Sequence, residues 1–157
     1  MKDYDHVRAN FKGAKLLVIE DSDDHWMFIK SALQYSLPEV TAVRVTTSEQ
    51  ALGLLNDWCI QEWEMPKLII QDLYLPSREM GWQLLEHIKS LPAPASHIPV
   101  VIMSSSEYKS DITESYQRGS SSYLIKPRRF TEWIAYFKEL RAYWWETVTL
   151  PPMHFSI

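Results

Sequence analysis

Five short runs of apolar or β-branched residues divide the chain, and residues with helical spacing follow each of them. The run at 16–19 is continuously apolar rather than alternating, as expected for a strand buried on both faces of a parallel sheet. The runs at 68–72 and 99–103 have the same buried character, and runs at 40–45 and 121–125 complete the set. The pattern therefore predicts five strands.

Apolar residues recur at the spacing of one helix face between these strands. The predicted helices cover residues 28–33, 51–58, 81–88, 107–117 and 131–145, with Gly81 opening the third of them. Pro38, Pro92 and Gly119 mark helix ends, because proline interrupts a helix and glycine suits the residue after one. Five strands alternating with five helices predict an α/β fold with a doubly wound parallel sheet.

The expected domain organisation is simple. The first residues show no clear pattern, so 1–14 are interpreted as an N-terminal arm, 15–146 as one domain, and 147–157 as a C-terminal tail. A chain of 157 residues that is 46% hydrophobic and 23% charged is large enough for a single substantial core.

Charge and composition exclude several classes of partner. A net charge of −4 gives no basic surface for nucleic acid. The chain has a single cysteine, Cys59, its first residues contain no apolar run typical of a signal peptide, and no segment is apolar enough to span a membrane. We therefore expect a cytoplasmic protein that binds neither nucleic acid nor membrane.

The ends of the predicted strands carry most of the candidate chemistry. Glu20 and Asp21 follow the first strand, Asp72 ends the third, Ser104 follows the fourth, and Lys126 follows the fifth. Ligands of open α/β sheets bind in the crevice beyond the carboxyl ends of the strands, so these side chains are expected to converge. Residues that simply begin turns are the alternative interpretation, above all for Ser104.

Three converging carboxylates repel one another unless a cation lies among them or some stay protonated. Oxygen ligands of this kind suit Mg²⁺. Lys126 and Ser104 offer a positive charge and a hydroxyl donor to the oxygens of a phosphoryl group, which leaves Asp72 as the nucleophile.

This set of residues resembles the receiver domain of two-component response regulators. The matching features are Glu20-Asp21, Asp72 in the motif D-L-x-L-P, Ser104 after P-V-V-I-M, Gly119, and Lys126-Pro127. The resemblance implies a flavodoxin-like (βα)5 fold and phosphoryl transfer from a sensor histidine kinase to Asp72.

The same resemblance assigns further roles at the site. It implies a Mg²⁺ site made of Glu20, Asp21, Asp72 and the main-chain carbonyl of Tyr74. Ser104 and Lys126 would contact the phosphoryl group, and Tyr123 matches the aromatic switch position. The chain would then be no enzyme beyond reactions at its own Asp72. An unphosphorylated pseudo-receiver that serves as a constitutive interaction module is the alternative.

The end of the chain and the loop after Asp72 add detail. Residues 142–152 are similar to the ending of single-domain receivers that serve bacterial, notably cyanobacterial, phytochromes, so a phytochrome is a candidate kinase. The loop 73–80 is one residue longer than the usual family form, which leaves its contacts open. Tyr74 is unusually bulky for its position and could slow the access of water to the acceptor.

Aromatic residues gather on the last predicted helix. Trp133, Tyr136, Trp144 and Trp145 contribute to an apolar arc wider than a helix needs to cover one edge of a sheet. Such a surplus predicts a homodimer interface. The alternative is that the tail folds back and covers Trp145 within the monomer.

Overall fold

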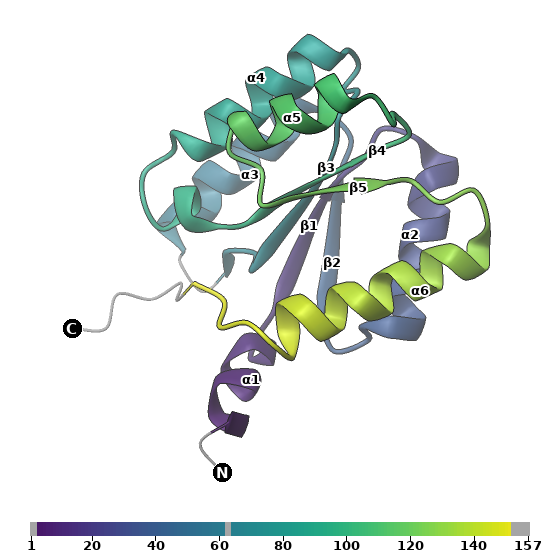
Figure 1. Ribbon diagram of the computed structural model, residues 1–157. Helices are drawn as coiled ribbons and strands as arrows, with labels where there is room; N and C mark the ends of the chain where they lie inside the picture. The colour runs from purple at the N-terminus through teal and green to yellow at the C-terminus, as the bar shows by residue number, and fades with distance from the viewer. Residues whose placement is uncertain (1–2, 62–63, 152–157) are drawn as a thin grey trace.

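The computed structural model describes residues 3–61 and 64–151 and contains a parallel five-stranded sheet of order β2-β1-β3-β4-β5 (Figure 1). This order, with helices on both faces, confirms the predicted flavodoxin-like α/β fold. The strands are β1 (Lys15–Ile19), β2 (Thr41–Val45), β3 (Leu68–Asp72), β4 (Val100–Ser104) and β5 (Ser122–Ile125). The helices are α1 (Asp3–Phe11), α2 (Asp23–Ser36), α3 (Ser48–Ile60), α4 (Arg78–Lys89), α5 (Lys109–Gln117) and α6 (Phe130–Leu140), with a short turn of 3-10 helix, η2 (Ala95–His97), and a π-helical turn, η3 (Arg141–Trp145).

The core lies on both faces of the sheet, as the continuous apolar runs require. On β1, Leu17 and Ile19 pack with residues of α3 and α4, while Leu16 and Val18 pack with residues of α2 and α6. Helices α3, α4 and α5 cover one face in Figure 1, and α2 and α6 cover the other. Burial is nearly complete along the central strands β1, β3 and β4, and the carboxyl ends of these strands carry Glu20, Asp72 and Ser104.

Helix α4 begins three residues earlier than predicted. It starts at Arg78, and the Ser77 hydroxyl caps it by accepting a hydrogen bond from the Met80 amide at 3.2 Å. Gly81 is therefore inside the helix rather than at its start. A Cβ at Gly81 would lie 1.7 Å from the carbonyl oxygen of Leu73, so only glycine lets α4 pack this closely against the end of β3.

The N-terminal segment, for which the sequence showed no clear pattern, contains a helix. Helix α1 (Asp3–Phe11) presents Asn10, which is 2% exposed, to the C-terminal segment. The Asn10 side-chain amide donates to the carbonyl oxygens of Trp145 at 3.0 Å and Val148 at 2.6 Å, and its oxygen accepts from the Leu150 amide at 3.0 Å. These bonds join two segments about as distant in sequence as the chain allows. We call this arrangement the Asn10 clasp.

The end of the chain follows the prediction in part. Helix α6 and the π-helical turn η3 together span the predicted last helix, and Leu150 packs into the core beyond them. Of the predicted tail, residues 152–157 lie outside the described residues. Within residues 3–61 and 64–151, the structure has no helix with the length and apolar content needed to cross a bilayer.

Candidate functional site

The acidic pair lies at the carboxyl end of β1, where the predicted crevice begins. Glu20 is buried, and its Oε2 accepts a hydrogen bond from the Ser22 amide at 3.3 Å. Asp21 is exposed to solvent. Because β2 and β3 flank β1 on either side, both carboxylates lie close to the centre of the sheet edge.

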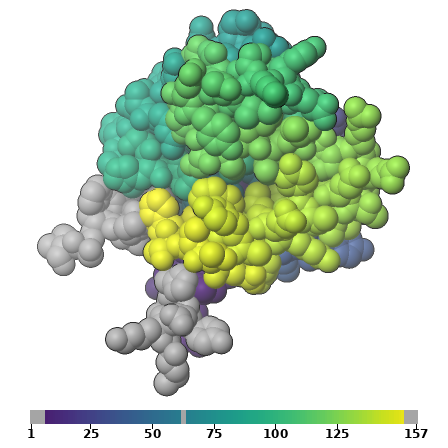
Figure 2. Space-filling model, in the orientation of Figure 1, coloured from purple at the N-terminus to yellow at the C-terminus, as the bar shows by residue number. Residues whose placement is uncertain are grey.

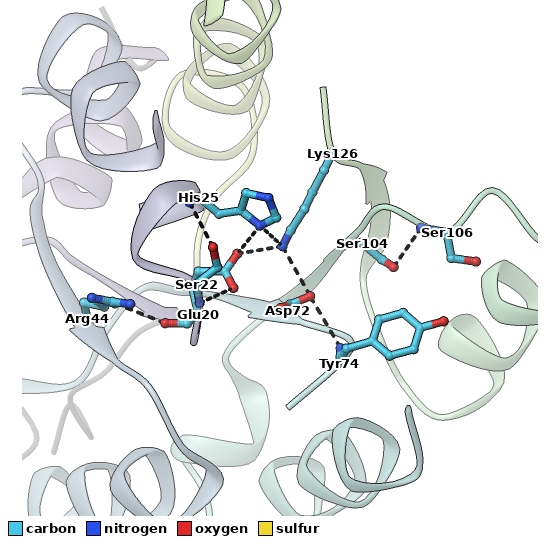
Figure 3. Close-up of polar contacts among 9 residues, drawn as sticks. All are labelled: Glu20, Ser22, His25, Arg44, Asp72, Tyr74, Ser104, Ser106 and Lys126. Atoms are coloured by element: carbon cyan, nitrogen blue, oxygen red, sulfur yellow. Dashed lines mark hydrogen bonds and ion pairs between the residues drawn. The ribbon is translucent and has the colours of Figure 1, made fainter. Parts of the chain in front are cut away.

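Asp72 ends β3, next to the acidic pair. It is 7% exposed, and the Tyr74 amide donates to its Oδ1 at 3.4 Å (Figure 3). Carboxylate oxygens of Glu20, Asp21 and Asp72 all lie within 4.8 Å of one another. The structure thus brings together the three carboxylates that the sequence placed at the ends of two different strands.

Lys126 supplies the positive charge at the centre of this cluster. Its Nζ donates to Glu20 Oε1 at 2.7 Å and lies 3.4 Å from Asp72 Oδ1. It also lies 2.9 Å from Nδ1 of His25, a residue that the sequence analysis did not identify (Figure 3). Lys126 thus contacts two of the three clustered carboxylates, Glu20 and Asp72, and one ammonium group does not balance three negative charges.

This excess of negative charge affects the pKa values of the site. Burial raises the pKa of Asp72 to about 8, and the carboxylates of Glu20 and Asp21 push it upward while Lys126 opposes the rise. Burial acts upward on Glu20 as well, but the Lys126 ammonium and the hydrogen bonds from Asp72 and Lys126 outweigh it and lower the Glu20 pKa. In the metal-free site, this raised pKa favours the protonated form of Asp72 below about pH 8.

Ser104 completes the predicted set from β4. It is fully buried, and its Oγ accepts a hydrogen bond from the Ser106 amide at 3.0 Å. The Lys126 amide donates to the Ser104 carbonyl at 2.7 Å, which fixes β4 and the end of β5 side by side. The Tyr123 hydroxyl points inward and donates to the Ser106 carbonyl at 2.8 Å.

Two site residues had no clear signal in the sequence. His25 lies in the first turn of α2, where it borders an open cavity of about 860 Å³ beside Lys126. Arg44, on β2, donates from Nε to the Glu20 carbonyl at 3.0 Å and pairs with Asp23 at 2.8 Å. Neither residue directly follows the end of a strand, so the strand-end rule that identified the other site residues does not select them.

The predicted dimer residues do not form one exposed face. Trp133 and Trp145 are 2% and 0% exposed and belong to the core of a single chain, so the exposed part of the predicted face is smaller than expected. The C-terminal segment folds back over Trp145, as in the alternative interpretation, because the Asn10 clasp holds it there. Tyr136 and Trp144 are half-buried and keep accessible surface.

The donor atoms around Asp72 fit a hard divalent cation. The cluster consists of carboxylate oxygens, and it lacks the cysteine and histidine ligands of a typical zinc site. Glu20, Asp21 and Asp72 are the residues that could hold such an ion. Its positive charge would oppose the burial and the carboxylate repulsion that raise the pKa of Asp72 in the metal-free chain.

Comparisons with known proteins give one consistent result. The family model described as the response regulator receiver domain matches residues 16–138. Response regulator Rcp1 from Synechocystis sp. is 30% identical over 139 residues, which cover 87% of this chain and 92% of Rcp1.

Two solved structures are also similar. The Mn²⁺-bound form of Rcp1 is 28% identical with a TM-score of 0.75, and the match covers 88% of this chain and 99% of that one. The phosphorylated cyanobacterial phytochrome response regulator RcpA is 30% identical with a TM-score of 0.78 and the same coverage.

Proposed function

The chain belongs to the response regulator receiver domain family, and we propose that it works as a phosphorylation switch whose Asp72 accepts a phosphoryl group from a sensor histidine kinase. The observation that carries this proposal is the meeting of Glu20, Asp21, Asp72 and Lys126 at one edge of the sheet. A receiver domain is not a substrate-converting enzyme. The reactions that we expect are uptake and loss of phosphate at its own aspartate.

Mg²⁺ is the proposed cofactor. Glu20, Asp21 and Asp72 would hold it together with the main-chain carbonyl of Tyr74, and the Mn²⁺-bound structure of the relative Rcp1 supports a divalent cation in this class of protein. A bound divalent cation supplies positive charge that favours the ionised carboxylate and the oxygens of the incoming phosphoryl group.

The proposed transfer is a displacement at phosphorus. An Oδ atom of ionised Asp72 forms a bond to the phosphorus of a phosphohistidine, the phosphorus–nitrogen bond breaks, and the electron pair returns to the imidazole nitrogen of the donor. The open cavity beside Lys126 and His25 offers the donor a route to the site. The product is an acyl phosphate on Asp72.

Ser104 and Lys126 are the proposed contacts of the bound phosphoryl group. Lys126 already lies 3.4 Å from Asp72, so a small movement away from Glu20 would bring its ammonium to the new oxygens. Tyr123 is the proposed switch residue, because its bond to the Ser106 carbonyl depends on the loop that carries Ser104.

A phytochrome is the proposed class of kinase. This extension rests on similarity to RcpA, which is described as a cyanobacterial phytochrome response regulator and matches 88% of this chain at 30% identity.

A homodimer is also proposed, on a smaller surface than the sequence analysis expected. Tyr136, Tyr143 and Trp144 border a groove of about 250 Å³ between α6 and β5, and Tyr143 is 54% exposed. Figure 2 shows α6 and the C-terminal segment forming one continuous surface. Strand β5 is at the edge of the sheet, which is where a second copy would pack in this proposal.

Phosphate uptake tests the main proposal. Incubation with Mg²⁺ and acetyl phosphate, followed by intact mass measurement, is expected to show one acid-labile phosphate. Asp72→Asn should remove it, and Asp57→Asn, which changes an exposed carboxylate on α3, should leave it unchanged. Equal uptake by the Asp72→Asn variant would contradict the assignment.

Sedimentation tests the dimer. Tyr143→Glu places a charge in the proposed interface, whereas Tyr35→Glu places it on α2, where Tyr35 is 74% exposed. We expect the first variant alone to dissociate the dimer at tens of micromolar protein. A monomeric wild-type chain at that concentration, with and without acetyl phosphate, would rule the dimer out.

A further inference from the structure

Tyr74 is held by a neighbour that the proposed mechanism does not use. The Arg78 Nη2 donates to the Tyr74 hydroxyl at 3.0 Å, and the guanidinium lies 5.8 Å from the centre of the Tyr74 ring. Tyr74 is two residues beyond Asp72, and its own amide contacts the acceptor carboxylate. The ring extends from the acceptor loop toward the side of the site where Ser104 and Ser106 lie (Figure 3).

Arg78 is in turn fixed by a buried carboxylate on another helix. Asp111, on α5, is 2% exposed, and its Oδ1 lies 3.1 Å from Arg78 Nε, close enough for an ion pair although not aligned for a hydrogen bond. The Ser106 hydroxyl donates to Asp111 Oδ2 at 2.5 Å. A carboxylate this deeply buried needs such partners, because its desolvation is otherwise unfavourable.

Asp111 is also linked to the β4–α5 loop, which follows the proposed phosphate contact Ser104. Ser106 connects Asp111 to Ser104 through its amide and to Tyr123 through its carbonyl. Tyr74, Arg78, Asp111 and Ser106 thus form a chain of contacts from the acceptor loop to the β4–α5 loop. We call it the Tyr74 brace.

We propose that Arg78 and Asp111 are positioning residues that hold Tyr74 beside Asp72 and so slow the hydrolysis of its acyl phosphate. The inference rests on the proposed phosphorylation of Asp72. Arg78 acts through Tyr74, Asp111 acts through Arg78 and Ser106, and neither of them touches the reacting atoms.

The reaction that the brace slows is attack by water. A water oxygen forms a bond to phosphorus while the bond between phosphorus and the Asp72 oxygen breaks. The electron pair stays on the Asp72 carboxylate, and the proton of the water passes to solvent, so that inorganic phosphate leaves. An aromatic ring held beside the acceptor occupies space that an attacking water needs, whereas a freely moving ring leaves that space open for part of the time.

The rate of phosphate loss tests this proposal. After phosphorylation with acetyl phosphate and removal of the excess reagent, the decay of the acid-labile mass is followed in Mg²⁺. Loss of one charged hydrogen-bond partner should speed the decay of Arg78→Ala and Asp111→Asn by about three- to tenfold. Tyr74→Ala should decay at least as fast as either of them.

A double substitution separates positioning from a general structural effect. If Arg78 acts through Tyr74, then Arg78→Ala should add nothing to the decay rate of a Tyr74→Ala chain. The same acceleration in both backgrounds would overturn the proposal, as would a wild-type rate in Arg78→Ala. Arg78→Lys serves where the alanine variant folds poorly, since lysine keeps the charge but cannot contact Tyr74 and Asp111 together.

Arg118→Ala is the matched control. Arg118 also pairs with acidic groups, at 2.8 Å from Glu86 and 2.6 Å from Glu114, and its guanidinium lies 5.7 Å from the ring centre of Trp82. The Arg118→Ala substitution therefore removes the same kinds of contact as Arg78→Ala but leaves the Tyr74 brace unchanged. Its decay rate should equal that of the wild type.

A second readout separates this proposal from the proposed function. Fluorotyrosine incorporated into the unphosphorylated chain gives a ¹⁹F resonance for Tyr74, assigned by its loss in Tyr74→Phe. Arg78→Ala should shift or broaden that resonance, and Arg118→Ala should not. An unchanged resonance would refute the brace, whereas failure of the wild-type chain to take up phosphate would refute the proposed function instead.

Discussion

Replacing Asp72 with asparagine is expected to stabilise the metal-free chain, because folding buries this carboxylate beside two others. The pKa of Asp72 rises from 3.8 to about 8, first through burial and then through Glu20 and Asp21. Between those pH values the folded chain keeps a proton that the unfolded chain has released. The free energy of unfolding contributed by Asp72 therefore falls as the pH rises through this window.

The size of the effect follows from the same shift. A difference of about four pKa units corresponds to at most about 6 kcal/mol once the pH exceeds both values. The attraction of Lys126, whose Nζ lies 3.4 Å from Asp72, already lowers the pKa within this net shift. We expect Asp72→Asn to be more stable than the wild type by about 2–4 kcal/mol near pH 8, and by much less near pH 5.

Urea unfolding followed by tryptophan fluorescence, with a chelator present, measures the difference directly. Asp57→Asn is the control, because that carboxylate is exposed on α3. Saturating Mg²⁺ should stabilise the wild type more than Asp72→Asn and so reduce the gap. A gap that does not change with pH, or a less stable Asp72→Asn chain, would refute the account of a strained acidic cluster.

Three further predictions concern single residues. Asn10→Ala should lower the free energy of unfolding by about 2–4 kcal/mol in urea titrations, because it leaves the clasp's buried polar groups unpaired; a change near zero would contradict the clasp. Gly81→Ala should lower the free energy of unfolding by more than about 2 kcal/mol in the same assay. Gly53→Ala, on α3 with open space around it, should raise the free energy of unfolding by about 0.5–1 kcal/mol. Asp21→Asn should weaken Mg²⁺ binding at least about tenfold by fluorescence titration, and Asp23→Asn, whose side chain is 88% exposed, should have little effect. Equal losses for these last two would contradict the metal site.

Much of the fold could be predicted because buried parallel strands have a recognisable local sequence pattern. A strand buried on both faces must be apolar at every position, as residues 16–19 are, and the polar residue that follows it lies at the edge of the sheet. That rule placed Glu20, Asp72, Ser104 and Lys126 correctly at the carboxyl ends of their strands.

The features that could not be predicted depend on contacts between residues far apart in sequence, which no local sequence pattern indicates. Helix α1 is tied down by Asn10, a single polar residue whose partners lie more than a hundred positions away. Trp145 has the spacing of an interface residue, and only the path of the following segment shows that it is core. The pairing of Arg78 with Asp111 likewise depends on the relative positions of helices α4 and α5, which spacing along the chain does not give.

The location of the phosphate tests the central claim most directly. An acyl phosphate on aspartate is reduced by borohydride to homoserine, which peptide mass spectrometry can assign to one position. After incubation with Mg²⁺ and acetyl phosphate, we predict homoserine at position 72 and no other modified acidic residue. Homoserine at Asp21 or any other aspartate, 5-hydroxynorvaline at Glu20 or any other glutamate, or unmodified Asp72 in a chain that has gained phosphate, would contradict the assignment of Asp72 as the phosphoryl acceptor.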